Sequence, residues 1–243
     1  MRLYSHNMTR NTNGGADPTE QNRMQKRVQR TRTRLLQAAL TAFGEKGVEA
    51  TTIEDVTERA DLGKGTFYRH FSSKEDIVIT LIAESVQRLV QDIRKSVGAR
   101  QHLPDVLAGL LQAHTTFFMH HRQEFVMLFQ GRLLLKLERE DPAGLEQPFL
   151  DYLREVEAQV TPFMPIPVDI RKVRRVACGL AGFVSGYLSF AMIGLAEREI
   201  EASFGSLRNA FVAACSAMLT TPSPTTGAES TPAVTLKTTG VSK

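Results

Sequence analysis

The stretch DLGKGTFYRHFSSKED, residues 61–76, gathers side chains that suit the binding of a polyanion. Cations neutralise phosphates, tyrosine and histidine donate hydrogen bonds to phosphate oxygens, and threonine offers a hydroxyl and a methyl group to base edges. Glycine lets a backbone approach closely, and two phenylalanines lie four residues apart, as on the buried side of a helix. The residues that could bind are Lys64, Gly65, Thr66, Tyr68, Arg69, His70 and Lys74. This pattern predicts a nucleic-acid interface.

Two short helices are expected to position this interface. Apolar residues recur at helical spacing over 35–43, and this first helix should end near Lys46, because Gly47 can take the left-handed conformation that stops a helix. A second helix follows, and the turn at residues 61–63 separates it from a third helix over 64–71. Two short helices joined by such a turn predict a helix-turn-helix, whose second helix enters the major groove.

Capping boxes mark two further helix starts. Thr51 with Glu54 should open the second helix, and Ser72 with Glu75 should open a long helix, since each hydroxyl and carboxylate can satisfy an orphan amide. The rest of the chain has helical period and no strand-like alternation. Later helices are predicted at about residues 104–121, 123–138, 143–161, 168–195 and 198–219.

The segment Arg34–Ile77 resembles the DNA-binding domain of the TetR family of bacterial transcriptional regulators. The resemblance rests on Ala38-Ala39, Phe43, Gly47, Thr51-Thr52, the run GTFYRHF over residues 65–71, and Lys74-Glu75. The chain departs from the family pattern at Val56-Thr57, Asp61 and Gly63. These departures bear on how the third helix is capped and packed, and they leave the expected fold unchanged.

The resemblance implies both the fold and the DNA contacts. We expect an all-α protein, with an N-terminal three-helix bundle that contains the helix-turn-helix and then a larger helical domain for effector binding and dimerisation. Such a protein is expected to be a repressor, released from a palindromic operator by a small apolar effector. The implied phosphate contacts are Thr52, Tyr68, His70 and Lys74, and the residues nearest the bases are Lys64, Gly65, Thr66 and Arg69.

Composition sets the expected domain boundaries along the 243 residues. We predict a disordered basic arm over 1–28, a helix-turn-helix DNA-binding domain over 29–75 with the motif at about 52–71, a helical ligand-binding and dimerisation domain over 76–220, and a disordered tail over 221–243. Cations run from Arg23 to Arg34 without an acidic residue between them, which favours an anionic partner. Because no apolar signal segment begins the sequence, we expect a cytoplasmic protein.

Aromatic residues and glycines suggest two further sites in the larger domain. The resemblance implies an effector pocket between helices, and we expect a subset of Phe117, Phe118, Phe125, Phe129, Phe149, Tyr152, Phe183 and Tyr187 to line it. It also implies a homodimer in which the last two long helices form a four-helix bundle. Candidate residues of that dimer interface are Gly179, Gly182, Gly186, Phe204 and Phe211.

An uncharged run over 176–196 raises a membrane alternative, because about 20 apolar residues can span a bilayer. Cations at 171–175 would form a positive flank, and Gly182 with Gly186 has the small-residue spacing of membrane helix pairs. Glycines and serines dilute the run, and no second segment resembles it. A helix buried between its own core and a second subunit would look the same, so we expect no membrane partner.

His114, His120 and His121 near Glu124 raise an enzyme alternative. His120 and His121 are adjacent and point to different faces, and no zinc-protease, nucleophile-elbow, phosphate-loop or dinucleotide motif occurs. Cys178 and Cys215 lie apart in apolar helical stretches and are expected to be core residues. We therefore expect no catalytic residue, metal or cofactor.

Overall fold

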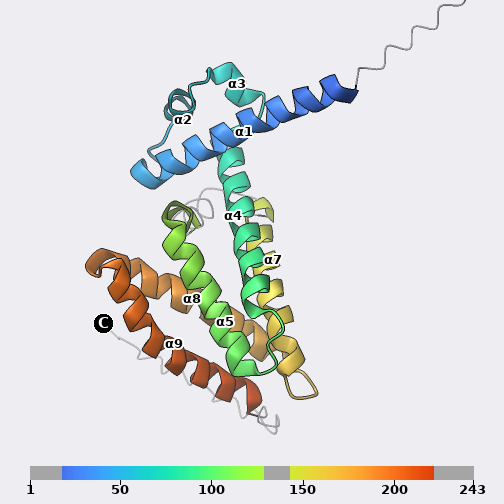
Figure 1. Cartoon of the computed structure of the whole chain (residues 1–243), viewed down its shortest axis with the longest axis vertical. Helices are drawn as coiled ribbons and strands as arrows, with labels where there is room; N and C mark the ends of the chain where they lie inside the picture. Colours follow the sequence, from blue (N-terminus) through green and yellow to red (C-terminus); the bar gives the residue numbers. More distant parts are fainter. Residues whose placement is uncertain (1–17, 129–142, 222–243) are drawn as a thin grey trace, which may run out of the picture.

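The computed structural model describes residues 18–128 and 143–221, and every element within these ranges is helical. This confirms the expected all-α class. Figure 1 shows a small N-terminal domain above a larger helical domain, with one helix running from the first into the second. The small domain consists of α1 (Pro18–Lys46), α2 (Ile53–Arg59) and α3 (Lys64–Tyr68), and the helix that leaves it is α4 (Lys74–Val97).

The larger domain continues from α4. It contains α5 (Leu103–His120), a helical segment over 122–128, α7 (Ala143–Val160), a 3-10 turn over Thr161–Phe163, α8 (Ile170–Gly194) and α9 (Glu197–Thr220). Figure 1 shows α4, α5 and α7 running alongside one another, with α8 and α9 against α5. The predicted helix over 123–138 lies mostly outside the described residues.

The small domain folds around the apolar stripe of α1. Leu35, Ala39 and Phe43 are buried there, and Phe67 and Phe71 pack beneath them from the α3 side. Gly47 has φ +82°, and its amide donates to the Phe43 carbonyl at 2.9 Å, so α1 ends at Lys46 as predicted. Burial of both phenylalanines fixes which side of α3 faces outward.

The N-terminal end of α1 differs from the prediction of disorder up to residue 28. The helix begins at Pro18, a position that suits proline because its missing N–H would have no helical partner there. Residues 22–30 are exposed and are mostly good helix formers. Because residues 31–46 already pack on the core, extending the helix outward adds one hydrogen bond per residue without a new nucleation cost.

Both helix caps lie one residue later than predicted, and only the cap of α2 is a capping box. Thr52 caps α2: its hydroxyl accepts from the Asp55 amide at 3.1 Å, and the Asp55 carboxylate accepts from the Thr52 amide at 2.9 Å. Ser73 caps α4 by accepting from the Asp76 amide at 3.2 Å. Thr51 is instead buried, and its hydroxyl donates to carbonyls at the end of α1, so packing selects the second of two adjacent hydroxyl residues.

Candidate nucleic-acid interface and effector cavity

The turn between α2 and α3 is held by backbone hydrogen bonds and one left-handed residue. Asp61 has φ +50°, a conformation that aspartate tolerates better than most residues. The Asp61 amide donates to Glu58 at 3.0 Å, and the Leu62 amide donates to Thr57 at 2.9 Å. Gly63 then caps α3 without a side-chain hydrogen bond. The family departures at 61 and 63 are therefore compatible with a well-formed turn.

The outward face of α3 combines a small residue with polar ones. A Cβ added at Gly65 would meet nothing within 4 Å, so a ligand can approach the backbone there. Arg69 Nη2 donates to Thr66 Oγ1 at 3.0 Å, which places a guanidinium and a hydroxyl side by side. Tyr68 is 57% exposed, and its ring contacts the edge of buried Phe67 with centroids 5.5 Å apart. This face therefore presents donors over an open stretch of backbone.

Two of the predicted contact residues already have partners on α2. The Thr52 hydroxyl is used by the capping box with Asp55, and it also donates to the Asp55 carboxylate at 3.0 Å. Lys64 forms an ion pair with Glu54. Both pairs lie at the protein surface. To contact a nucleic acid, Thr52 and Lys64 would have to give up these partners on α2.

Lys74 has a structural role that the sequence did not predict. Its ammonium donates to the carbonyls of Val48, Glu49 and Thr51 at 3.0, 3.0 and 3.2 Å. An ammonium has three N–H donors, so all three point into the loop between α1 and α2. These hydrogen bonds tie the start of α4 to this loop, and the phosphate contact expected at Lys74 stays a prediction.

His70 lies half-buried at the end of α3, beside two arginines. Partial burial lowers the pKa of His70 below its ordinary value, and the charges of Arg69 and Arg32 lower it further. Arg32 also lies 5.0 Å over the ring of Phe71 and forms an ion pair with Glu84 of α4 at 3.0 Å. The interface is thus connected to the first turns of α4.

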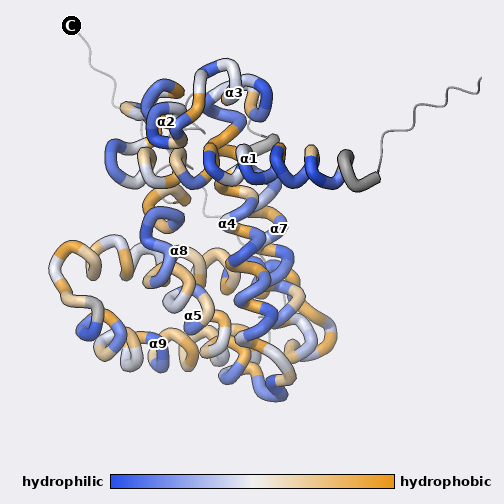
Figure 2. Tube along the Cα trace, turned by 45° about the horizontal axis from the view of Figure 1, so that its top comes forward, coloured by the Kyte–Doolittle hydropathy of each residue, from blue (hydrophilic) through white to orange (hydrophobic). Residues whose placement is uncertain are grey.

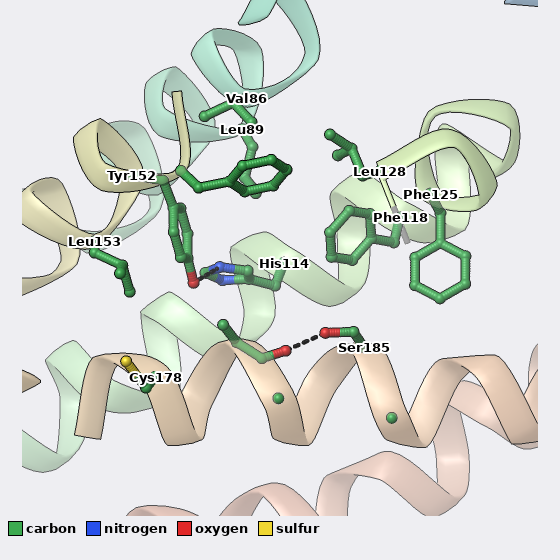
Figure 3. A pocket seen from close by; sticks show the side chains of 14 residues that line it. Val86, Leu89, His114, Phe118, Phe125, Leu128, Tyr152, Leu153, Cys178 and Ser185 are labelled. Carbon is green, nitrogen blue, oxygen red and sulfur yellow. Dashed lines mark hydrogen bonds between the residues drawn. The ribbon is translucent and has the colours of Figure 1, made fainter. Parts of the chain in front are cut away.

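A partly open cavity of about 460 Å³ lies between α4, α5, α7 and α8. This volume falls within the range of small-molecule sites. Figure 3 shows that apolar side chains form most of its wall, with a few polar groups among them. The lining residues are Val86, Leu89, His114, Phe118, Phe125, Leu128, Phe149, Tyr152, Leu153, Cys178, Ala181, Gly182, Ser185 and Gly186.

Four of the aromatic residues predicted for a pocket line this cavity, namely Phe118, Phe125, Phe149 and Tyr152. Phe117 does not line the cavity, and its ring packs in the core against Phe118 and His121. Phe183 and Tyr187 do not either, because both face α9: the Phe183 ring stacks on Phe211, and the Tyr187 hydroxyl lies 2.6 Å from Ser203 Oγ. Phe129 lies outside the described residues.

Glycines of α8 supply cavity wall that the aromatic pattern could not predict. Gly182 and Gly186, expected at the dimer interface, both line the cavity. Of the other predicted interface residues, Phe204 is buried against the α8 rings within the chain, and Phe211 is half-buried. Gly179 is exposed beside Phe211. The rings of Phe204 and Phe211 thus pack against Phe183 within the chain.

The exposed apolar face of α8 and α9 carries different residues from those predicted. Phe190 and Ile193 of α8 are 78% and 83% exposed, and Leu207 and Met218 of α9 are also exposed. Figure 2 shows apolar segments along both helices, at the side of the larger domain away from α4 and α7. We refer to these four residues as the α8–α9 face.

α8 itself is long and apolar enough to cross a membrane, judged by length and composition alone, and it is the one such helix among the described residues. About 33% of its most apolar 18-residue stretch is buried inside the protein. Its buried side, which includes Val176, Leu180 and Val184, packs in the helical domain. A cation of the predicted flank, Arg174, forms an ion pair with Glu157 of α7.

The three histidines of the enzyme alternative have different surroundings. His120 Nδ1 lies 2.7 Å from the carbonyl of Thr116, and His121 Nδ1 lies 3.5 Å from Glu124, whose carboxylate also accepts from Arg88. Within residues 18–128 and 143–221, no group of three or more histidine, cysteine or acidic residues could hold an ion. His114 lines the cavity instead.

The fold and the site define a helix-turn-helix protein with a second, cavity-bearing helical domain. Residues 35–81 match the model of the family described as bacterial regulatory proteins, tetR family. The helix-turn-helix domain of the chain is therefore similar to the DNA-binding domain of that family.

Several curated regulators are similar in sequence over part of their length. The repressor KstR2 of Mycobacterium tuberculosis is 32% identical over 100 residues, which cover 41% of this chain and 50% of KstR2. The activator FasR of Mycolicibacterium smegmatis is 28% identical over 120 residues, covering 49% of this chain and 55% of FasR. The chain thus spans about half the length of these relatives.

Solved structures share the whole architecture at low identity. The fatty acid degradation regulator FadR from Bacillus halodurans has a TM-score of 0.60 and 16% identity, with 75% of this chain and 94% of FadR covered. FadR from Bacillus subtilis, solved in complex with stearoyl-CoA, has a TM-score of 0.59 and 15% identity, with 77% and 97% covered. These likenesses establish the fold.

Proposed function

We propose that the chain is a sequence-specific, DNA-binding transcriptional repressor of bacteria, which acts as a homodimer and is released from its operator by a small, mostly apolar effector. The observation that carries this proposal is the outward face of α3, where Thr66, Tyr68 and Arg69 surround an open Gly65. The family match over 35–81 supports DNA binding, and the repressor KstR2 among the relatives supports the sign of regulation.

In this proposal α3 enters the major groove. Thr66 and Arg69 read base edges, since arginine binds guanine in bidentate fashion and the threonine methyl can meet thymine. Tyr68 and His70 bind phosphates, while Thr52 and Lys64 join the interface after exchanging their partners on α2. Lys74 positions the loop before α2 instead of touching DNA.

The projecting part of α1 supplies further phosphate contacts. Arg23, Lys26, Arg27 and Arg30 are exposed, and within the described residues none of them forms an ion pair. Figure 1 shows this part of α1 extending past α2 and α3. A helix with four unpaired cations fits the backbone of duplex DNA that flanks the operator half-site.

The homodimer is proposed to form through the α8–α9 face. Phe190 and Ile193 are large apolar side chains that are mostly exposed, and contact of such side chains with water is unfavourable. A second copy would cover both of them in a four-helix bundle. The rotation of the two copies about a two-fold axis would place the α3 helices about one helical turn of DNA apart, or further, on a palindromic site. The protein would then work in the cytoplasm, where bacterial DNA lies.

The effector is proposed to bind in the cavity and to act through α4. Val86 and Leu89 of α4 line the cavity, while Glu84, on the same helix, forms an ion pair with Arg32 of the DNA-binding domain. A ligand that packs against α4 can shift the α3 helices of a dimer, provided that it binds the shifted state more tightly.

The test is selection of duplexes from a random pool by the full-length protein, followed by fluorescence anisotropy on a selected duplex and on a scrambled one. We expect the wild type to prefer the selected duplex by at least about a hundredfold. Arg69→Ala should narrow this preference about tenfold or more, because one base contact contributes about 1–3 kcal/mol of discrimination. Tyr68→Phe should weaken binding to both duplexes alike.

Lys95→Ala is the matched control, since Lys95 is an exposed cation at the far end of α4 and its loss changes the net charge equally. It should leave both affinities within a factor of two. Equal affinity of the wild type for all duplexes would refute the regulator proposal. Recovery of the protein with membranes, instead of as a dimer in sedimentation, would favour the membrane alternative for α8.

A further inference from the structure

The hydrogen-bond donors on the cavity wall already donate to acceptors within the protein. His114 Nδ1 lies 2.6 Å from the Leu110 carbonyl, and a carbonyl can only accept, so Nδ1 carries the proton. His114 is 1% exposed, and burial lowers its pKa to about 4, so the ring is neutral at physiological pH. Its Nε2 is then an acceptor, and the Tyr152 hydroxyl, 2.7 Å away, must donate to it.

Ser185, on the opposite wall, also donates its hydroxyl proton within the protein. Its hydroxyl donates to the Ala181 carbonyl one turn earlier in α8. Burial raises the pKa of the Tyr152 phenol well above its ordinary range, so Tyr152 keeps its proton and its bond to His114. Figure 3 shows the His114–Tyr152 bond on one side of the cavity and the Ser185 bond on the other. Towards the cavity, the hydroxyl oxygens of Tyr152 and Ser185 can therefore act only as hydrogen-bond acceptors.

The described lining also lacks formal charge. Its other members are apolar or glycine, apart from Cys178, whose thiol is only a weak donor. An anion placed beside Tyr152 and Ser185 would lose hydration and meet acceptors only, which is unfavourable. A cation would lose hydration without a carboxylate on these walls to compensate. An uncharged donor is the group that this lining satisfies.

We propose that the cavity takes a largely apolar, uncharged molecule that donates a hydrogen bond, through a hydroxyl or an N–H group, to Tyr152 Oη or Ser185 Oγ. His114 is the positioning residue that sets this preference, because it accepts the hydrogen bond from the Tyr152 hydroxyl and so leaves the phenol oxygen to face the cavity only as an acceptor. The inference rests on the proposed effector site only in treating the cavity as a place where a ligand binds.

Matched fluorescent probes test the preference without DNA. N-phenyl-1-naphthylamine is uncharged, apolar and carries one N–H; its N-methyl derivative lacks the donor, and 8-anilinonaphthalene-1-sulfonate adds an anion to the same skeleton. Titrated into the full-length protein, the amine should bind at least about tenfold more tightly than either of the other two. 1-Benzoylnaphthalene, which replaces N–H by a carbonyl, should displace the amine poorly.

Variants separate a specific contact from general apolar binding. The double variant Tyr152→Phe with Ser185→Ala should bind the amine and its N-methyl derivative alike. His114→Leu frees the Tyr152 proton, so the ketone should gain about tenfold relative to the amine, a change in preference that simple loss of packing would not produce. Tyr187→Phe removes a hydroxyl on the α9 side of α8 and should leave the preference unchanged.

The proposal fails if the sulfonate or the ketone binds the wild type as tightly as the amine. It fails equally if no probe binds, or if the N–H preference survives in the double variant. The wild-type series needs no substitution, so a variant that does not fold leaves the test intact. If the cavity selects donors as stated while its occupancy leaves DNA affinity unchanged, the proposed effector function falls and this inference stands.

Discussion

Replacing Lys74 by methionine tests whether its ammonium serves the fold or the DNA. Lys74→Met keeps most of the apolar stem and removes three hydrogen bonds to the carbonyls of Val48, Glu49 and Thr51. Net contributions of about 0.5–1.5 kcal/mol per bond give a loss of about 1.5–4.5 kcal/mol in the free energy of unfolding. A central value of about 3 kcal/mol lowers the Tm by about 6–12 °C in a chain of this size.

Differential scanning calorimetry measures the Tm, and amide hydrogen exchange locates the change. We expect faster exchange over residues 47–52, where the three carbonyls lie, and little change in the larger domain. Lys95→Met is the control, because the Lys95 ammonium contacts only Asp92 on the surface and should contribute little. A Lys74→Met protein with an unchanged Tm and exchange, but weaker binding to every duplex, would refute this reasoning and restore the phosphate contact predicted from sequence.

Three further predictions concern DNA binding and assembly. Because burial and the charges of Arg69 and Arg32 lower the pKa of free His70 below its ordinary value, its cation forms only under acidic conditions; DNA affinity should therefore rise as the pH falls through that range, and should not rise in His70→Gln. Replacing the four cations of residues 23–30 by glutamine should make the slope of log affinity against log salt shallower by up to about 3.6, measured by anisotropy. Phe190→Asp should give a monomer in sedimentation at micromolar protein, whereas Leu150→Asp on α7 should not.

The helix-turn-helix could be predicted because its signals are local. Phe67 and Phe71 mark the inner side of α3 by spacing alone, and both are buried. Gly47 marks the end of α1 by its conformational freedom, and it takes a positive φ there. The residue that caps α2 could not be predicted from the local pattern alone. Thr51 and Thr52 are each followed three residues later by an acid, and only the burial of the first hydroxyl assigns the cap to the second.

The cavity could be predicted only in part, because aromatic content does not distinguish a wall from a core. Phe183 and Gly182 are neighbours in sequence, yet successive residues of a helix point about 100° apart. Phe183 therefore faces α9, while Gly182 faces the cavity. Which side of α8 meets which neighbour depends on how α5, α7 and α9 pack around it. The hydrogen bond between His114 and Tyr152 joins residues 38 apart in sequence and has no local signal.

α4 is the element through which the cavity and the interface can influence each other. It spans 24 residues, about 36 Å of continuous helix, so a displacement at Val86 or Leu89 is carried to its first turn. The Lys74 hydrogen bonds connect this first turn to the loop before α2, and the Glu84–Arg32 pair, ten residues further along the helix, connects α4 to α1. A hundredfold loss of operator affinity requires about 2.7 kcal/mol of difference in ligand binding between the two arrangements. Linkage requires operator DNA to weaken ligand binding by the same factor, so a ligand with equal affinity for free and DNA-bound protein could fill the cavity without acting as an inducer.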